Sequence, residues 1–376
     1  MVGLREDEID RSVVIFGAGA TKACGGPLTN EILPDVLRLR EHLARKDHID
    51  RVEAFLVDKF SLPPPDKRST EHFPPLPLVL SLVDTALDRE DAFGKDWPPD
   101  SLREVRACLE YAIFALLEYR LRRIGAHYKT FFEMLYAAVP PESVTVISLN
   151  YDLIADNTLS AAAERRGEPG LPDYGVDIAT DAYRTTTKVG RLLKLHGSLN
   201  WLYCPNCHRL ELGIAPSGVR TWKALGPLYG KRPVNLAKNY ADRSTPCPDC
   251  GTGFKPVLIT PTHLKDYRNP HVARTWYEAA RELRHAKRAI FVGYSMPDDD
   301  VEVIYLFKRG LADLQAGAIT VVDHATGDAT ALDRNPVGRR YRALFGDKID
   351  WRPDGFEAWT ADAAAEGLVM AAVRHR

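Results

Sequence analysis

The stretch "SVVIFGAGAT", Ser12 to Thr21, is the best indicator of the fold. A short β-branched run followed by glycines is typical of a buried parallel strand that turns into a helix. Similar runs alternate with helical patterns along the chain, which predicts an α/β fold: a doubly wound, Rossmann-like parallel sheet with crossover helices. The other predicted strands are "SVTVISLN" (143–150), "RLLKLHG" (191–197), "PVLITP" (256–261), "KRAIFVGYS" (287–295) and "GAITVVDHA" (317–325).

Three further segments surround this core. "SLREVRACLEYAIFALLEYRLRRIG", which starts at Ser101, carries apolar residues on one helical face and arginines on the other. Its helices belong to a large predicted insertion, in which the proline-rich residues 61–77 form an exposed loop. The predicted units are the core (12–30, 140–203 and 256–330), the helical insertion (31–139), a cysteine-rich module (204–255) and a C-terminal extension (331–376) whose tail "LVMAAVRHR" ends a last helix.

The composition is that of an ordinary globular protein. The chain has 376 residues, of which 45% are hydrophobic and 27% charged, and its formal net charge is −1. This balance gives no electrostatic reason to expect a nucleic acid or an anionic membrane as the main partner. No apolar run reaches the roughly 18 residues that span a bilayer, and the charged N-terminus lacks the apolar core of a signal peptide. We therefore expect a cytoplasmic protein with reduced thiols.

Four of the six cysteines form two C-x-x-C pairs, Cys204 with Cys207 and Cys247 with Cys250. Each pair can direct two thiolates at one metal, and two pairs complete a tetrahedral Cys₄ zinc site. Four cysteine ligands leave no open coordination position, so the zinc is expected to be structural. The alternative is four unrelated cytosolic thiols.

Polar residues follow the predicted strands at the edge where ligands bind in doubly wound sheets. In "GAGAT", glycines would let the backbone approach a pyrophosphate; the alternative is a tight strand–helix turn without a ligand. Asn150 and Asp152 follow the second strand, and His196 follows the third. An imidazole can accept a proton near neutral pH, an amide can orient a ribose hydroxyl or water, and a carboxylate can stabilise a cationic transition state. Helix capping by Asp152 and a structural role for His196 are the alternatives.

In order, these motifs resemble the sirtuin family. The matching elements are Gly17-Ala18-Gly19-Ala20-Thr21, Asn150-Tyr151-Asp152, His196-Gly197, the four cysteines, Gly293-Tyr294-Ser295 and Asp323, over roughly residues 12–325. The resemblance implies NAD⁺ as the ligand, with its pyrophosphate at Gly17–Thr21. It also implies that Asn150, Asp152 and His196 surround the nicotinamide ribose, and that Gly293, Ser295 and Asp323 hold the phosphate and adenosine end.

The departures from lysine deacylases point to a different activity. Where deacylases carry Gly-Ile-Pro-Asp-Phe-Arg, this chain has Gly26-Pro27-Leu28-Thr29-Asn30, and "PVLITPTHLKDY" replaces their peptide-pairing Phe-Gly-Glu segment. These changes and the large insertion resemble the sirtuin-like NAD⁺ hydrolases of bacterial antiphage defence. Some of those act beside a hexameric HerA-type ATPase, which makes such a partner an expectation here.

The sequence therefore predicts an NAD⁺ glycohydrolase that releases nicotinamide and ADP-ribose. Asp152 would stabilise the ribosyl cation or bind nicotinamide, Asn150 would position the ribose and water, and His196 would act as the base. The alternatives are an NAD⁺-dependent protein-lysine deacylase and a sensor that binds NAD⁺ or ADP-ribose without turnover. A homo-oligomer is also expected, because an NAD⁺-depleting enzyme must be restrained; the 31–139 insertion is the candidate surface, although its helices could equally cover the sheet.

Overall fold

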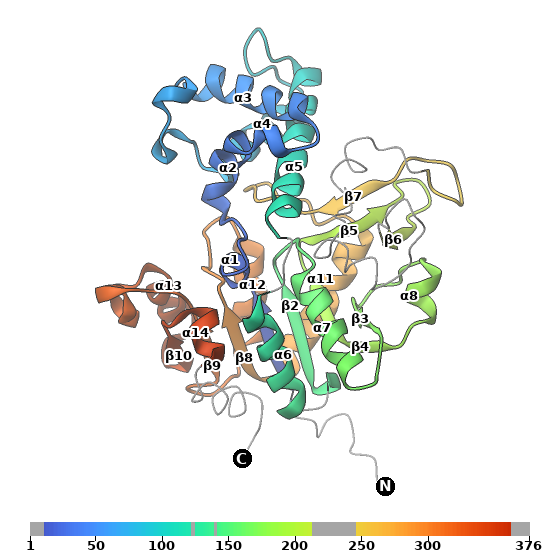
Figure 1. The fold of residues 1–376 in the computed structure, drawn as a ribbon, viewed down its shortest axis with the longest axis vertical. Coiled ribbons are helices and arrows are strands. Elements are labelled where there is room, and N and C mark those ends of the chain that lie inside the picture. Colours follow the sequence, from blue (N-terminus) through green and yellow to red (C-terminus); the bar gives the residue numbers. More distant parts are fainter. Residues whose placement is uncertain (1–10, 122–124, 139–140, 213–245, 362–376) are drawn as a thin grey trace.

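Seven parallel strands form the central sheet of the protein, a computed structural model that describes residues 11–121, 125–138, 141–212 and 246–361 (Figure 1). The strand order is β10-β9-β8-β1-β2-β4-β3, and every neighbouring pair is parallel. The predicted doubly wound α/β sheet is thus confirmed. The strands are β1 (Arg11–Phe16), β2 (Val144–Ser148), β3 (Leu171–Asp173), β4 (Lys188–Lys194), β8 (Ala286–Val292), β9 (Ile319–Val322) and β10 (Ile349–Arg352).

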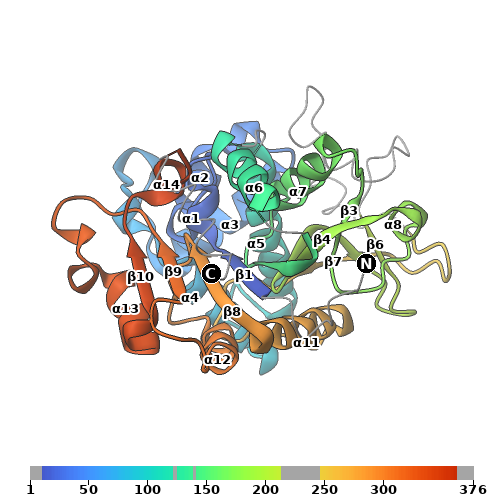
Figure 2. The same cartoon turned by 90° about the horizontal axis from the view of Figure 1, so that it is seen from below.

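Helices cover both faces of this sheet (Figure 2). On β1, Val14 and Phe16 pack into one apolar core, whereas Val13 and Ile15 pack into another. Alternate residues of a strand point to opposite faces, so a run without polar interruption supplies both cores. The first core includes side chains of α6 (Ala126–Ala138), α7 (Ile154–Arg165) and α14 (Gly355–Ala361), and the second those of α11 (Pro270–His285), α12 (Val301–Gly310) and α13 (Pro336–Phe345).

Five strands differ from the sequence prediction: β3, β5 (Gly197–Tyr203), β6 (Leu210–Leu212) and β10 were not predicted, and β7 (Lys255–Leu258) lies in another sheet. The edge strands β3 and β10 were not predicted, because "LPD" is too short for a periodic signal and "IDWR" is only half-buried throughout. The predicted strand "PVLITP" exists as β7, but it does not extend the parallel sheet. It pairs antiparallel with β5, which also pairs with β6 in a separate three-stranded sheet.

The corner between the two sheets explains the sequence "LHGS". β4 ends at Lys194 and β5 begins at Gly197, so His196 lies in the turn between them. Gly197 has a φ of +78°, and a Cβ atom at this position would lie 1.9 Å from the carbonyl oxygen of Val257. Only glycine fits this approach of β5 to β7. The abrupt change from leucines to polar residues is therefore a turn from the core sheet into the small sheet.

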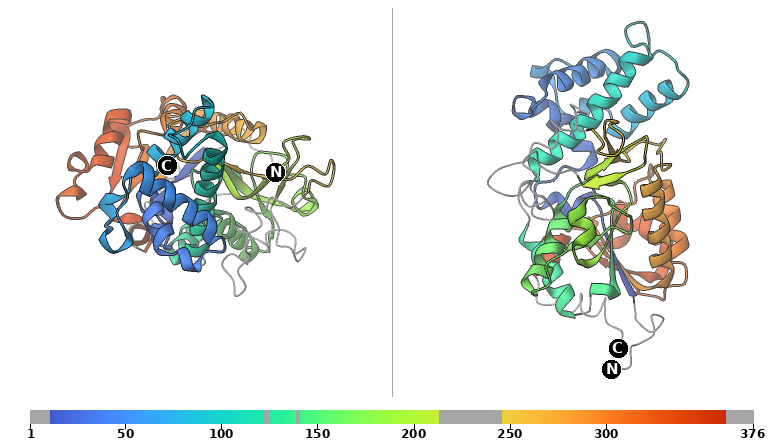
Figure 3. Two further views of the ribbon diagram at one scale, coloured as in Figure 1. Left: turned by 90° about the horizontal axis from the view of Figure 1, so that it is seen from above. Right: turned by 90° about the vertical axis from the view of Figure 1, so that its right-hand side faces the viewer.

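Four helices form a lobe beyond the carboxyl ends of the parallel strands (Figure 3). They are α2 (Ile32–Arg38), α3 (Lys46–Phe60), α4 (Leu76–Asp88) and α5 (Pro99–Arg120), and the other three pack around α5. Pro34 lies in the first turn of α2, where it does not break the helix. The proline-rich loop contains two short 3₁₀ turns, and its last two residues already belong to α4, so the loop ends two residues earlier than predicted.

Not all of residues 31–139 lie in this lobe. Helix α6 packs against α7 and α14 on the face of the sheet, so it covers the sheet as the alternative proposed. The division of the chain into separate units stays a prediction, and the tail "LVMAAVRHR" lies outside the described residues. The helices in the described ranges are too short or too polar to cross a membrane. The short helices α1 (Ala18–Lys22) and α8 (Asp181–Thr185) follow β1 and precede β4.

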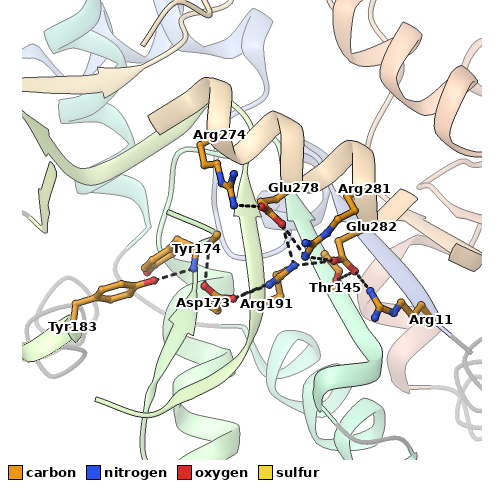
Figure 4. Close-up of polar contacts among 11 residues, drawn as sticks. Arg11, Thr145, Asp173, Tyr174, Tyr183, Arg191, Arg274, Glu278, Arg281 and Glu282 are labelled. Carbon is orange, nitrogen blue, oxygen red and sulfur yellow. Dashed lines mark hydrogen bonds and ion pairs between the residues drawn. The ribbon is translucent and has the colours of Figure 1, made fainter. Parts of the chain in front are cut away.

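A charged cluster, here called the Arg191 network, holds α11 against the strands (Figure 4). Arg191 on β4 reaches Asp173 as well as Glu278 and Glu282 on α11, at 2.8–3.4 Å. The two glutamates are nearly fully buried, yet each carboxylate has several partners. The other members of the Arg191 network are Arg11, Thr145, Arg274 and Arg281.

Candidate functional site

A cleft opens at the carboxyl ends of β1, β2 and β8, where the chain changes direction across the sheet. From β1 the chain proceeds outward through β2 and β4, and it later returns to β8 on the other side of β1. Connections that leave in opposite directions create a crevice at such a switch point. The cleft has a volume of about 560 Å³. Its walls include the predicted residues Gly17, Ala18, Gly19, Thr21, Asn150, Asp152, His196, Gly293, Ser295 and Asp323.

The glycines after β1 permit close contact with the loop after β8. The Gly17 N–H donates to the Val292 carbonyl at 3.0 Å, and the Gly19 N–H donates to the Gly293 carbonyl at 2.8 Å. A Cβ atom on Gly17 would lie 2.6 Å from the Gly293 oxygen. Backbone packing therefore accounts for these glycines without a ligand, as the turn alternative stated. Ala20, predicted to bind the ligand, is fully buried and does not line the cleft.

Asn150 joins the end of β2 to this glycine turn. Its side-chain Nδ2 donates to the Gly17 carbonyl at 2.9 Å, and its backbone N–H donates to the Ser148 hydroxyl at 3.2 Å. The first bond uses only the NH₂ group of the amide. Asn150 is buried at the cleft wall, and it fixes the relative position of the two strand ends.

Asp152 combines a capping bond with a perturbed carboxyl group. Its Oδ1 accepts the backbone N–H of Ile154 at 2.9 Å, so it does cap the start of α7, as the alternative proposed. Burial raises the pKa of Asp152 from 3.8 to about 6, although the nearby Lys194 ammonium opposes this rise. Lys194 donates to the Asp152 carbonyl and forms a fully buried ion pair with Asp156 at 3.1 Å. The carboxyl is thus held rigidly in a desolvated wall of the cleft.

His196 presents a free basic nitrogen. Its Nδ1 lies 3.2 Å from the Leu149 carbonyl, which can only accept, so Nδ1 carries the proton. Its Nε2 is buried and has no hydrogen-bond partner among the residues that the structure describes. Burial lowers the pKa of His196, while the Asp300 carboxylate acts in the opposite direction. Burial thus favours the uncharged form of the imidazole, and its Nε2 lone pair accepts no hydrogen bond from the described residues.

Sequence reasoning missed two charged residues beside this imidazole. Asp300 lies 3.9 Å from His196 Nε2 and accepts the Tyr294 hydroxyl at 3.0 Å. Lys265 is buried, pairs with Asp300 at 2.9 Å, and also pairs with Asp299. The side chains of Asp300, Tyr294 and Lys265 are nearly fully buried, whereas that of Asp299 is partly exposed. The acidic run "PDDD" directly after "GYSM" was the available signal, since it follows the end of β8.

Asp323 and Ser295 lie on the β8–β9 side of the cleft. Asp323 follows β9, and its backbone bonds to the Arg352 carbonyl and the Gly355 N–H, both at 2.9 Å, connect it to the end of β10. Burial raises the pKa of its carboxyl group. Ser295 is exposed, and its carbonyl accepts Arg340 Nη1 at 2.8 Å. This side thus offers hydroxyl and carboxyl groups that can contact a ligand.

The four cysteines converge at the far end of the small sheet. Cys204 Sγ lies 3.4 Å from Cys250 Sγ, Cys207 Sγ lies 3.5 Å from Cys247 Sγ, and all four sulfur atoms lie within 4.8 Å of one another. A tetrahedral zinc site with Zn–S bonds of 2.3 Å requires sulfur atoms about 3.8 Å apart. The cluster therefore has the geometry to hold a metal ion.

Comparisons with known proteins assign neither a family nor an activity. No protein-family model matches the chain, and no curated protein matches its sequence. Among solved structures, it is similar to a Sir2 enzyme studied for the mechanism and regulation of Sir2 enzymes, with 16% identity, coverage of 98% of this chain and 93% of that one, and a TM-score of 0.40. It is also similar to Sir2 bound to a p53 peptide and NAD⁺, with 11% identity, coverage of 96% and 95%, and a TM-score of 0.41.

Proposed function

We propose that the cleft binds NAD⁺ and hydrolyses the bond between its nicotinamide and ribose. The observation that carries this proposal is His196: a buried imidazole at the switch point of a parallel sheet, whose Nε2 has no hydrogen-bond partner in the described part of the chain. A buried acceptor without a partner is unfavourable to folding, and such groups are concentrated at functional sites. NAD⁺ itself is suggested by the ordered motifs of the sequence.

The chemistry follows from the leaving group. The ribose C1′–nitrogen bond breaks with its electron pair on the pyridinium nitrogen, which yields neutral nicotinamide and needs no general acid. The ribose develops an oxocarbenium charge, which the ionised Asp152 carboxylate would stabilise. Water then bonds to C1′ and gives its proton to His196 Nε2, from which the proton passes to solvent. Asn150 would fix the position of the glycine turn and orient the ribose against it.

Water is favoured over an acylated lysine as the nucleophile because residues 256–267, of which Pro261 and Lys265 line the cleft, are already hydrogen-bonded within the chain. The segment that replaces the peptide-pairing stretch of deacylases is bonded to the helical lobe. Thr262 lies 3.1 Å from the Ser81 hydroxyl, the His263 N–H donates to the same hydroxyl at 2.8 Å, and Arg106 donates to Thr260 at 2.7 Å. An extended peptide would have to displace these contacts.

The test is to mix the purified protein with NAD⁺ alone and to follow nicotinamide and ADP-ribose. Steady, equimolar release of both products supports hydrolysis. A turnover that requires an acetyl-lysine peptide and yields O-acetyl-ADP-ribose would establish the deacylase alternative. Binding of NAD⁺ without any product, measured by calorimetry, would establish the sensor alternative.

We also propose that the four cysteines hold one structural zinc ion. Metal analysis should find one zinc per chain, and replacement of the exposed pair, Cys207→Ser with Cys250→Ser, should remove it. Cys24→Ser is the matched control, because Cys24 lies outside the cluster and the metal content should not change. A wild-type protein without zinc after purification in chelator-free buffer would contradict this assignment.

A role in antiphage defence, with a homo-oligomer or a HerA-type ATPase as partner, remains part of the proposal. It is supported only by the likeness of the sequence motifs to that class of hydrolases. Light scattering after size-exclusion chromatography, with and without NAD⁺, measures the oligomeric state. A monomer under both conditions would remove self-assembly as the means of restraint.

A further inference from the structure

A second cavity, with a volume of about 670 Å³, lies where the helical lobe meets the end of α1. Its walls come from the end of α1, from α2, from the proline-rich loop and from the last residue of α5. Pro27 lines both this cavity and the cleft. Cavities of this size accept small organic ligands.

The cavity is lined by more cations than anions. Lys22, Arg38, Arg68 and Arg120 line it, whereas only Glu31 and Asp35 among its lining residues are acidic. Arg68 also pairs with Glu53, which lies outside the lining, so four cations share three carboxylates and an excess of one positive charge remains. In a protein whose net charge is −1, this concentration of cations in one concavity is a local feature. A hollow with charges of one sign attracts ligands of the opposite sign.

The carboxylate of Asp35 occupies only some of the N–H donors of the two arginines that bind it. Arg38 donates to its Oδ1 and Arg120 donates to its Oδ2, so two guanidinium groups share one buried carboxylate. Each guanidinium has five N–H donors. The side chains of Arg38 and Arg120 are 67% and 30% exposed, so the N–H groups that Asp35 does not occupy can donate to an anionic ligand in the cavity.

The remaining walls suggest the class of ligand. Phosphoryl groups match the planar fork of arginine and accept several hydrogen bonds at once. Ser69 and Thr70 add hydroxyl groups, and Phe73 and Leu37 add an apolar surface for the rest of a ligand. We propose that this cavity is a second binding site, separate from the cleft, for a small phosphate-bearing molecule.

Inorganic pyrophosphate is the probe, and its binding to the full-length protein is measured by calorimetry at low and at physiological salt. The test variant combines Lys22→Gln with Arg38→Gln, because both side chains are at least 46% exposed and their loss should not prevent folding. Each lost charged hydrogen bond weakens binding by about tenfold or more, so the dissociation constant should rise by at least about tenfold.

The matched control combines Lys46→Gln with Arg103→Gln. These side chains are 50% and 55% exposed and form ion pairs, but they do not line the cavity, so binding should match the wild type. A second variant, Arg120→Lys, keeps the positive charge but lacks the planar fork of arginine, and it should bind more weakly while retaining the thermal stability expected of a paired cation. Undetectable binding to the wild type, or binding that is equal in the test and control variants, would overturn the proposal.

Discussion

The Arg191 network and the cleft both contain clusters of buried ionisable groups, but these groups differ in how many partners they have. In the network, the carboxylates of Glu278 and Glu282 each have several cationic partners (Figure 4). In the cleft, His196 Nε2 has no hydrogen-bond partner within the described ranges, and burial raises the pKa of Asp152 to about 6. Paired charges hold elements together, whereas an unpaired base and a desolvated acid are available for chemistry. The difference predicts which substitutions affect stability and which affect activity.

The largest effect is expected from His196→Ala. Loss of a general base lowers a rate by about 10²–10⁴-fold. The variant also loses the buried hydrogen bond from Nδ1 to the Leu149 carbonyl, which lowers the free energy of unfolding by about 1–3 kcal/mol, so its fold is checked by thermal unfolding. ADP-ribose should still bind. The rate of NAD⁺ cleavage and the affinity for ADP-ribose are measured side by side, with His72→Ala as the control at an exposed position. A variant that keeps wild-type turnover would eliminate His196 as the base.

Arg191→Met should have the opposite effect. It removes one cation from two glutamates whose side chains are 4% and 6% exposed. Breaking a fully buried pair costs about 3–5 kcal/mol; the 27% exposure of Arg191 and the remaining arginines reduce this to about 2–4 kcal/mol. Turnover of the folded enzyme should be unchanged. Urea denaturation provides the measurement.

The control for this variant is Arg268→Met, at an arginine that is 90% exposed and pairs with Asp266. Its loss should change the free energy of unfolding by less than about 0.5 kcal/mol. If the Arg191 variant lost activity as strongly as the His196 variant while staying folded, the separation of structural from functional charge would fail.

Asp152→Asn tests whether the ionised Asp152 carboxylate lowers the free energy of unfolding while it supports activity. The folded pKa of about 6 exceeds the ordinary 3.8, so between these values the folded chain binds more protons than the unfolded chain. The stability contribution is therefore fully present below pH about 4 and is lost as pH rises through 6. At 1.36 kcal/mol per pH unit, the ionised group costs about 3 kcal/mol at pH 8.

Asparagine keeps the oxygen that caps α7 and removes the charge. The variant should be more stable than the wild type by about 1–3 kcal/mol at pH 8, with a smaller gain at pH 4.5, and it should turn over NAD⁺ more slowly. Thermal unfolding at the two pH values measures this. An equal change in stability at both would mean that Asp152 does not titrate as described.

Some features of the fold and of the cleft were predictable from the sequence, and others were not. The parallel sheet was predictable because β1 and its equivalents are continuous apolar runs that end in glycine or polar residues. The position of Asn150, Asp152 and His196 at one edge of the sheet was predictable because each follows such a run, whereas their roles stay a prediction. Lys265 and Asp300 were missed because they reach His196 from a loop and a helix start, which no periodicity marks. The Arg191 network was missed for a related reason: its members are spread from Arg11 to Glu282 and meet only in the folded chain.

The smallest effect is expected from Lys265→Met, which alters the environment of the base rather than the base itself. The Lys265 ammonium lowers the pKa of His196, and it also neutralises Asp300, whose carboxylate raises that pKa. Without the cation, the pKa of His196 rises, and less of the imidazole is in its neutral, active form at acidic pH. The acidic limb of the pH–rate profile should therefore move to higher pH than in the wild type, with little change in the rate at pH 8. The pH–rate profile of the folded variant is compared with that of Lys129→Met, which replaces an exposed lysine outside the cleft. A uniform loss at both pH values would show that Lys265 supports the fold of the cleft and does not tune the base.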